Sequence, residues 1–337
     1  MKILVAGGAG YIGTHTCVSL LQSGHQVIVV DSLANSRIEN IQRVQDITGK
    51  RVEFIESDVR DRASLNAIFS KNRIDAVINF AGHKAVGDSV NKPLDYYDNN
   101  LNCAISLLEC MVSNNVKVMV FSSSAAVYAQ SAEPPITENT RTEPMSPYGR
   151  TKLYIEEMLR DVSRADKSWK VVILRYFNPV GAHPSGLIGE QSTGVPSNLL
   201  PTITRVAAGD QEMLNVFGND YDTRDGTAIR DYIHVMDLAR GHVQAIQKLE
   251  ALSEGRVLTV NLGTGKGYSV LEILKTFETV CGRKVPFNCV NRREGDMACC
   301  YADPGLAKVE LDWESELGMD EMCKDAWNWQ VQSIHLS

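Results

Sequence analysis

A tyrosine and a lysine one helical turn apart are the residues of this sequence best suited to proton transfer. Tyr148 and Lys152 are four positions apart, so a helix would place both side chains on one face. Upstream, Ser122-Ser123-Ser124 ends an apolar run, and the Ser124 hydroxyl can hydrogen-bond a reacting alcohol and relay its proton. Ser124, Tyr148 and Lys152 are therefore the candidate catalytic residues.

A glycine-rich turn near the start of the chain indicates the cofactor. Gly7, Gly10 and Gly13 follow an apolar run and open an amphipathic segment, as in dinucleotide-binding turns. Such glycines let the backbone approach a pyrophosphate, which the N–H groups of the next helix bind. Asp31 ends the second apolar run, where a carboxylate binds the adenosine ribose and repels a 2′-phosphate, so NAD is favoured over NADP. Asp58-Val59 follows the third run, and Asp58 fits either the adenine edge or a helix N-cap.

A tyrosine base that works near neutral pH needs a positive charge beside it. A free phenol has a pKa of about 10, and lowering it to about 7 requires about 4 kcal/mol. One cation about 4 Å away supplies a similar energy at an effective dielectric constant of about 20. We therefore expect the Lys152 ammonium and a positively charged nicotinamide ring together to stabilise the Tyr148 phenolate.

The elements that must position these residues alternate between strand and helix in the first half of the chain. Runs such as Val27-Ile28-Val29-Val30 are continuously apolar, which is typical of strands buried on both faces of a parallel sheet. We expect an α/β fold with a doubly wound parallel (Rossmann) sheet. The expected strands are Lys2–Ala6, Gln26–Val30, Val52–Glu56, Ala76–Phe80, Lys117–Ser122 and Val171–Arg175, and the expected helices lie near 11–23, 36–47, 62–71, 96–114 and 148–164.

The pattern changes after Phe177, where glycine and proline become frequent and the alternation is lost. This favours a smaller second domain of mixed α/β type, with many loops and scattered helices. A further apolar run, Leu258–Leu262, is expected to return to the main sheet. The expected division is a dinucleotide-binding domain over 1–178 with a return segment at about 232–262, and a substrate-binding domain mainly over 179–337. The ligands should lie between them, beyond the carboxyl ends of the strands.

The composition argues against several other classes of protein. The chain has 337 residues, 22% of them charged, and a formal net charge of -7 at pH 7. An acidic balance without a basic block argues against nucleic-acid binding, and no apolar stretch is long enough to span a membrane. The sequence begins without a secretory segment, and its eight cysteines show no zinc spacing. We therefore expect a cytoplasmic protein without a bound metal.

Together these motifs resemble the extended short-chain dehydrogenase/reductase family over almost the whole chain, and within it the UDP-glucose (UDP-galactose) 4-epimerases. The later motifs are more specific than the glycine turn. The stretches that carry the resemblance are Gly7–Thr16, Asn79–Val86, Lys92–Asn100, Phe121–Tyr128, Ser146–Lys152, Arg175–Pro179, Phe217–Tyr221, Arg230–Val235 and Arg292–Asp296.

The resemblance implies reversible inversion at C4 of a UDP-hexose through a 4-keto sugar, with NAD bound throughout the cycle. It also implies a homodimer formed through the helices near 96–114 and 148–164. The residues it implies for the NAD site are Gly7, Gly10, Tyr11, Ile12, Gly13, Asp31, Asp58, Val59, Phe80, Ala81, Gly82, Lys84, Asn99, Lys152 and Phe177.

The resemblance also implies a set of residues for the UDP-sugar. Arg230 and Arg293 suit the two phosphates because a guanidinium presents paired donors, and Phe217 suits stacking on uracil. The implied substrate residues are Lys84, Ser124, Tyr148, Asn178, Asn198, Leu199, Asn215, Val216, Phe217, Arg230, Arg293, Asp296 and Cys300.

Cys300 carries a prediction about substrate range. Some members of the family have a tyrosine at this position, which narrows the pocket at the 2-position of the sugar. A cysteine leaves space for an acetamido group. We therefore expect UDP-GlcNAc and UDP-GalNAc to be substrates in addition to UDP-Glc and UDP-Gal.

Other functions remain open from the sequence alone. A 4,6-dehydratase or a UDP-glucuronate 4-epimerase would share the cofactor and the Tyr148–Lys152 pair. Ala125-Ala126 follows Ser124 where dehydratases of the family need an acid, which favours the epimerase. The alternative outside enzymes is a non-catalytic NAD-sensing module, against which the retention of all three candidate catalytic residues argues.

Overall fold

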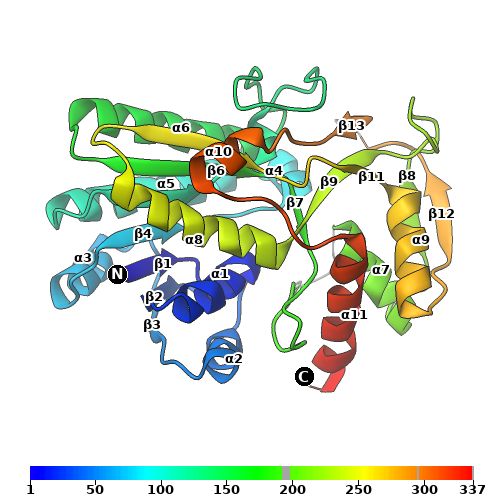
Figure 1. The fold of residues 1–337 in the computed structure, drawn as a ribbon, viewed down its shortest axis with the longest axis horizontal. Coiled ribbons are helices and arrows are strands. Elements are labelled where there is room, and N and C mark those ends of the chain that lie inside the picture. The colour runs from blue at the N-terminus through cyan, green and yellow to red at the C-terminus, as the bar shows by residue number, and fades with distance from the viewer. Residues whose placement is uncertain (192–197, 294–295, 336–337) are drawn as a thin grey trace.

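The computed structural model describes residues 1–191, 198–293 and 296–335, and it is built around a seven-stranded parallel sheet (Figure 1). The strand order is β10-β6-β5-β4-β1-β2-β3. This order, with crossovers in both directions from β1, is that of a doubly wound sheet, so the expected fold class is confirmed. The strands are β1 Lys2–Ala6, β2 Gln26–Asp31, β3 Glu53–Glu56, β4 Ala76–Asn79, β5 Val118–Ser122, β6 Lys170–Tyr176 and β10 Val257–Leu262.

Each face of this sheet has its own hydrophobic core, because successive side chains of a strand point to opposite faces. Ile3 and Val5 of β1 pack on one side, against helices α1 (Tyr11–Gln22), α2 (Glu39–Thr48) and α8 (Val235–Ala251). Leu4 and Ala6 pack on the other side, against α3 (Arg62–Lys71), α5 (Pro93–Ser113) and α6 (Pro147–Ala165). The continuous apolar runs of the sequence are therefore strands covered on both sides.

The expected strands and helices of the first half agree with the structure to within a few residues. The return to the main sheet is also confirmed, because β10 pairs in parallel with β6 from Val257↔Val171 to Leu262↔Tyr176. One helix, α4 (Val86–Asn91), was not expected, since a segment of six residues with a glycine shows no helical period.

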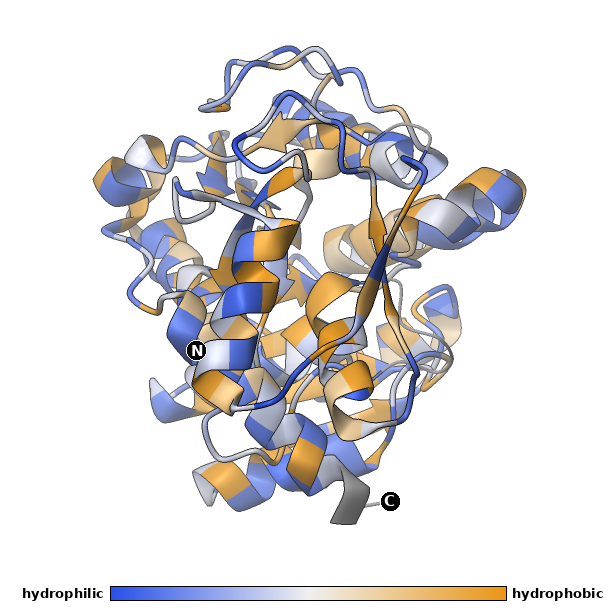
Figure 2. Ribbon diagram, turned by 90° about the vertical axis from the view of Figure 1, so that its right-hand side faces the viewer, coloured by the Kyte–Doolittle hydropathy of each residue, from blue (hydrophilic) through white to orange (hydrophobic). Residues whose placement is uncertain are grey.

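The second part of the chain contains more strands than the sequence indicated. A four-stranded sheet contains β7 (Asn178–Val180), β9 (Ile229–His234), β11 (Gly267–Ser269) and β13 (Cys299–Cys300), and β8 (Leu214–Phe217) pairs with β12 (Phe287–Val290). Helices α7 (Leu199–Ala208), α9 (Val270–Cys281), α10 (Gly305–Leu311) and α11 (Met319–His335) complete it. Figure 2 shows hydrophobic and hydrophilic residues alternating along the helices of the molecule.

None of the helices in the described part of the chain combines the length and the apolar character that crossing a bilayer requires.

Candidate active site

The catalytic candidates meet where β5 ends. Ser124 follows β5 and caps the short 3-10 helix η1 (Ala125–Val127) by accepting from Ala126 N at 3.1 Å. Helix α6 starts beside η1, where Ser146 Oγ accepts from Gly149 N at 3.1 Å. A Cβ on Gly149 would overlap the carbonyl of Ala126, so this glycine permits the close approach of α6 to η1. That approach places Tyr148 against Ser124.

Tyr148, Ser124 and Lys152 form one buried group. The Ser124 side chain lies close enough to the Tyr148 hydroxyl to lower the pKa of the phenol. Lys152 Nζ lies 5.9 Å from the centre of the Tyr148 ring and donates to the carbonyl oxygen of Ser122 at 2.8 Å. Both the tyrosine and the lysine are only 6% exposed. The structure thus brings together the three residues that the sequence selects for proton transfer.

Burial dominates the proton affinities at this group. Burial raises the pKa of Tyr148 well above its usual value, and the hydrogen bond with Ser124 opposes this only in part. Burial also lowers the pKa of Lys152 to about 8, although the negative charge of Glu156 opposes it. Lys152 alone does not bring Tyr148 near neutrality, so this arrangement also requires the second cation that the sequence argument invoked.

The glycine turn fits a dinucleotide sterically. Gly7 has a φ of 75°, which disfavours any residue with a Cβ. A Cβ on Gly13 would lie 2.5 Å from Gly7 O and 2.7 Å from Gly8 Cα, so Gly13 lets α1 pack on the turn. A Cβ on Gly10 would meet only Gly7 O, at 3.4 Å. Gly10 is therefore not needed for packing, which agrees with a role in letting a pyrophosphate approach.

Asp31 fixes the glycine turn as well as ending β2. Its Oδ2 accepts from Ala9 N at 3.0 Å, and its Oδ1 accepts from Leu33 N at 2.9 Å and Ser36 Oγ at 2.8 Å. Oδ2 has one protein donor, so it retains acceptor capacity for a ribose hydroxyl.

Asp58 does not cap the helix that follows it. The N-cap of α3 is Asp61, whose side chain accepts from Ala63 N and Ser64 N. Asp58 instead accepts from Arg60 N at 2.8 Å and pairs with its guanidinium at 2.7 Å. The N-cap alternative is therefore wrong, and the position beyond β3 remains compatible with the adenine site. The neighbouring Val59 is 5% exposed.

The loop after β4 is held by a residue that the sequence did not single out. Asn100 Oδ1 accepts from His83 N at 2.7 Å, and its Nδ2 donates to His83 O at 3.1 Å and to Thr151 Oγ1 at 3.0 Å. Asn100 is 2% exposed and ties the loop containing Gly82 and Lys84 to α6. Asn99, the expected cofactor residue, donates to Asn100 Oδ1 at 3.1 Å.

A second missed residue, Glu190, joins the two parts of the chain. Its carboxylate accepts from Lys84 Nζ at 2.9 Å and from Asn198 Nδ2 at 2.9 Å, and its side chain is 8% exposed. Nearby, the Tyr11 hydroxyl donates to Gly181 O at 2.7 Å. These contacts bring the expected residues Tyr11, Lys84 and Asn198 to the boundary between the first and second parts of the chain.

The residues expected to bind UDP form a charged and aromatic cluster. Arg230 lies 3.5 Å and Arg293 2.9 Å from the carboxylate of Asp296. The Arg293 guanidinium also lies 4.7 Å above the Phe217 ring. Asn215 and Phe217 are exposed on one face of β8, whereas the Val216 side chain is 1% exposed and points into the core. Val216 therefore has only its backbone to offer a ligand.

This cluster is continuous with the catalytic group. Cys300 pairs with Arg230 across β13 and β9, and it packs with Val127 and Phe177. Val127 belongs to η1, directly after Ser124. Asn178 is exposed at the start of β7, and Leu199 is partly buried at the start of α7.

Arg292 and Tyr221 are further missed residues beside this cluster. The Arg292 guanidinium stacks 4.1 Å from the centre of the Tyr221 ring and pairs with Asp220 at 2.7 Å. Glu294 and Gly295 of the same motif lie outside the described residues.

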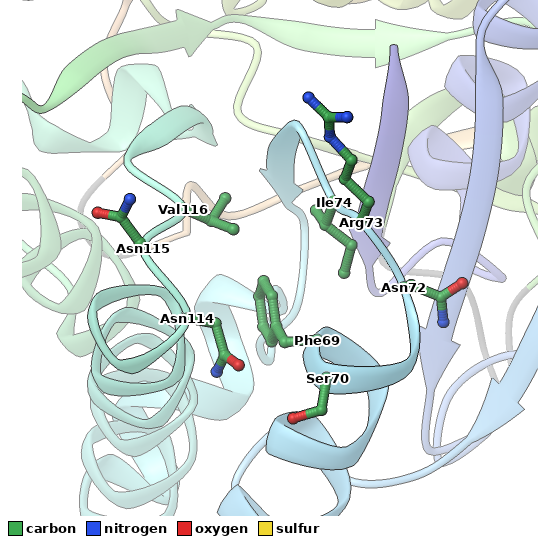
Figure 3. A pocket seen from close by; sticks show the side chains of 8 residues that line it. All are labelled: Phe69, Ser70, Asn72, Arg73, Ile74, Asn114, Asn115 and Val116. Carbon is green, nitrogen blue, oxygen red and sulfur yellow. The ribbon is translucent and has the colours of Figure 1, made fainter.

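The cavity in Figure 3 lies at the opposite edge of the sheet. Its volume is about 530 Å³, and its lining residues end α3 and α5 or precede β4 and β5. It therefore opens at the amino ends of the strands, away from Tyr148. Within the described ranges, no group of His, Cys, Asp and Glu side chains is arranged to hold a metal ion. The lining residues are Phe69, Ser70, Asn72, Arg73, Ile74, Asn114, Asn115 and Val116.

Comparison with known proteins places this geometry among its relatives. Residues 4–326 match the family model described as GDP-mannose 4,6 dehydratase. The UDP-glucose 4-epimerase of Bacillus subtilis (strain 168) is 54% identical over 335 residues, 99% of this chain and 98% of that protein. The crystal structure of UDP-glucose 4-epimerase from Bifidobacterium longum with NAD+ and UDP has a TM-score of 0.95 at 51% identity, covering 99% of both chains. The Stenotrophomonas maltophila enzyme with NAD and formylated UDP-arabinopyranose has a TM-score of 0.97 at 48% identity, covering 100% of both.

Proposed function

The chain belongs to the UDP-glucose 4-epimerases of the extended short-chain dehydrogenase/reductase family, and on that premise we propose how its own residues carry out the reaction. The reaction is the reversible C4 epimerisation of UDP-hexoses with NAD as cofactor. Bound NAD supplies the hydride chemistry, which is oxidation of C4 and its reduction from the opposite face. The chain supplies the proton chemistry and holds the sugar.

Tyr148 is the base that takes the proton of the 4-hydroxyl and later returns it. Ser124 hydrogen-bonds the reacting hydroxyl, and Lys152 supplies positive charge to the Tyr148 phenolate. The observation that carries this assignment is the grouping of the three side chains at the end of β5, with Ser124 close enough to Tyr148 to lower its pKa and Lys152 Nζ 5.9 Å from the centre of the phenol ring. The 4-keto sugar turns about its bond to UDP between the two proton transfers.

The cluster around Asp296 holds the UDP moiety. Arg230 and Arg293 provide forked donors for the diphosphate, and Phe217 provides an aromatic face for uracil. Their mutual distances, 3.5 Å and 2.9 Å to Asp296 and 4.7 Å between Arg293 and Phe217, support a shared role. We assign Asn178, Asn198 and Cys300 to contacts with the sugar.

The substrate range includes N-acetylhexosamines. Cys300 packs beside Phe177 and Val127, close to the end of β5, and its side chain is much smaller than a tyrosine ring. Space at this position accommodates a 2-acetamido group. The dehydratase alternative is less well supported, because the residues after Ser124 are Ala125 and Ala126, which offer no acid for elimination.

Residues 1–178 with 232–262 form the NAD-binding domain, and the rest of 179–337 forms most of the UDP-sugar domain. The enzyme is a cytoplasmic homodimer. Apolar side chains exposed on α4, α5 and α6 support the dimer, among them Val90 at 62%, Leu94 at 79% and Tyr154 at 47% exposure. The eight cysteines are all free thiols, which suits a reducing compartment.

A product assay tests these assignments together. The purified protein is incubated with UDP-Gal, UDP-GalNAc or UDP-GalA without added NAD, and the products are identified by chromatography. We expect UDP-Glc from UDP-Gal and UDP-GlcNAc from UDP-GalNAc. A stable 4-keto-6-deoxy product would instead establish a dehydratase, and turnover of UDP-GalA alone would establish a glucuronate epimerase.

A further inference from the structure

Helix α6 contacts all three serines at the end of β5. Tyr148 lies close enough to Ser124 for that serine to lower its pKa, and Lys152 Nζ donates to the Ser122 carbonyl at 2.8 Å. One turn further along the same face, Glu156 Oε1 accepts from Ser123 Oγ at 2.6 Å. Residues 148, 152 and 156 are spaced by one helical turn, so a single face of α6 binds three consecutive residues of the strand end.

Glu156 is a fully buried carboxylate with charged partners. Its side chain is 0% exposed. Its Oε1 accepts from Arg175 Nε at 2.9 Å, and its Oε2 accepts from Nη2 of the same guanidinium at 2.6 Å. Arg160 adds a further contact at 3.1 Å. Burial favours the neutral carboxyl, but hydrogen bonds from Arg175 and Ser123 and the nearby arginine charges hold the pKa of Glu156 below its usual value. Glu156 is therefore a carboxylate at neutral pH.

We propose that Glu156 is a positioning residue of the active site, which fixes the serine turn and keeps the Lys152 ammonium protonated through its negative charge. The inference rests on the catalytic roles proposed above for Tyr148 and Lys152. Glu156 is fully buried, and it acts through Ser123 and Lys152.

The surroundings of Lys152 make this charge important. On α6 its neighbours are Tyr148 and Glu156, and on β5 they are the Phe121 ring, 5.0 Å from Nζ, and the Ser122 carbonyl. From β6, Arg175 forms an ion pair with Glu156, and Tyr176 lies near Tyr148. Burial lowers the pKa of Lys152 to about 8, and Glu156 is the charged group that raises it. Without that charge, Lys152 would lose its proton at a lower pH.

Glu156→Gln tests this inference because it keeps the size and hydrogen-bonding capacity of the side chain while removing its charge. The measurement is kcat against pH from about 6 to 10 with saturating UDP-Gal, with NAD content and Tm determined alongside. We expect the alkaline limb of the profile to move down by about one pH unit. Ser123→Ala removes the hydrogen bond but leaves the charge, so its alkaline limb should stay at the wild-type pH.

A second variant protects the test against misfolding. Glu156→Gln leaves Arg175 buried without its charged partner, which can lower Tm. The double variant Glu156→Gln/Arg175→Gln removes both charges and should recover Tm. The alkaline limb of its kcat–pH profile should still lie at a lower pH than that of the wild type. A wild-type alkaline limb in a folded Glu156→Gln or double variant overturns the inference, as does an equal shift in Ser123→Ala. Lys152→Met is assayed beside them. Its full turnover would overturn the proposed catalytic roles themselves, whereas its inactivity beside an unshifted Glu156→Gln overturns only the positioning role.

Discussion

The Lys152 ammonium lies 5.9 Å from the centre of the Tyr148 ring and donates its hydrogen bond to the Ser122 carbonyl, at 2.8 Å. The phenol hydroxyl faces Ser124 instead, which lowers the pKa of the phenol. On one face of α6, the proposed proton transfer thus belongs to Tyr148 and its contact with Ser124, and the positive charge belongs to Lys152 and its contact with Ser122. Each contact can be removed separately, so the two contributions can be measured separately.

Tyr148→Phe should abolish turnover while leaving the cofactor bound. The change removes only the phenol oxygen that is proposed to take the proton, and general acid–base catalysis contributes about 10²–10⁴ in rate. We expect kcat to fall about 1,000-fold, with NAD released from denatured protein in wild-type amount. Tyr154→Phe on the same helix is the control, since Tyr154 is 47% exposed, and it should keep full activity. Turnover unchanged in Tyr148→Phe would remove the proposed base.

Lys152→Met should be inactive yet more stable than the wild type at neutral pH. A Lys pKa lowered from 10.5 to about 8 means that the folded state carries the full cost of a buried charge below pH 8. Subtracting the lost hydrogen bond to Ser122, we expect a gain of about 1–2 kcal/mol at pH 7. The gain should shrink between pH 8 and 10.5, where the folded wild type sheds its proton before the unfolded chain does.

Denaturant unfolding at several pH values measures this gain. Lys71→Met is the matched control, because Lys71 is exposed at the end of α3 and should show no such dependence on pH. A Lys152→Met variant that is less stable than the wild type at pH 7 would show that the buried Lys152 charge does not destabilise the folded state.

Gly10→Ala should lose NAD without loss of the fold. The added methyl group meets only Gly7 O at 3.4 Å, and the φ of Gly10, -74°, suits alanine. We therefore expect the circular dichroism spectrum to be retained and the NAD content of the purified protein to fall severalfold. Gly87→Ala, where the added methyl group meets nothing within 4 Å, is the control. Full NAD content in Gly10→Ala would place the pyrophosphate elsewhere.

Cys300→Tyr should narrow the substrate range. The ring would fill the space beside Phe177 and Val127 that an acetamido group requires. We expect UDP-GalNAc turnover to fall more than about 100-fold while UDP-Gal turnover changes less than about threefold, because steric exclusion acts on one substrate only. Cys299→Tyr, on the opposite face of β13, serves as the control. Equal activity of Cys300→Tyr on both sugars would contradict the role of this position.

Leu94→Arg should convert the proposed dimer into a monomer. Leu94 is 79% exposed at the start of α5, near the stacked rings of Tyr97 and Tyr154, and a charge there would be buried unpaired in the interface. Sedimentation velocity should show the mass halved. Val309→Arg is the matched control, since Val309 is 80% exposed on α10, outside these helices. A monomeric wild type would contradict the proposed dimer directly.

The strands of the main sheet are predictable from the sequence because both of their faces are buried. Continuous apolar runs such as Val27–Val30 can then belong to few other structures. The short strands β11 and β13 have three and two residues, too few to show any alternation. They form because β9 offers them a partner, which is information from the fold and not from the local sequence.

The site is predictable where its chemistry is local and not where it depends on distant partners. Tyr148 and Lys152 are visible because their spacing alone places them on one face. Asn100 and Glu190 act through His83 and Lys84, which are 17 and 106 residues away, and Glu156 is hydrogen-bonded to Ser123, which is 33 residues away. Nothing in the spacing of a single sequence marks such pairs, so only the folded chain reveals them.

The parallel pairing of β10 with β6 has a consequence for synthesis of the chain. β6 is complete at Tyr176, but the strand that covers its edge begins at Val257, so about eighty residues must leave the ribosome in between. During that interval the growing polypeptide presents an open apolar strand, a surface on which nascent chains aggregate. We therefore expect chaperone supply during synthesis to affect the yield of folded protein.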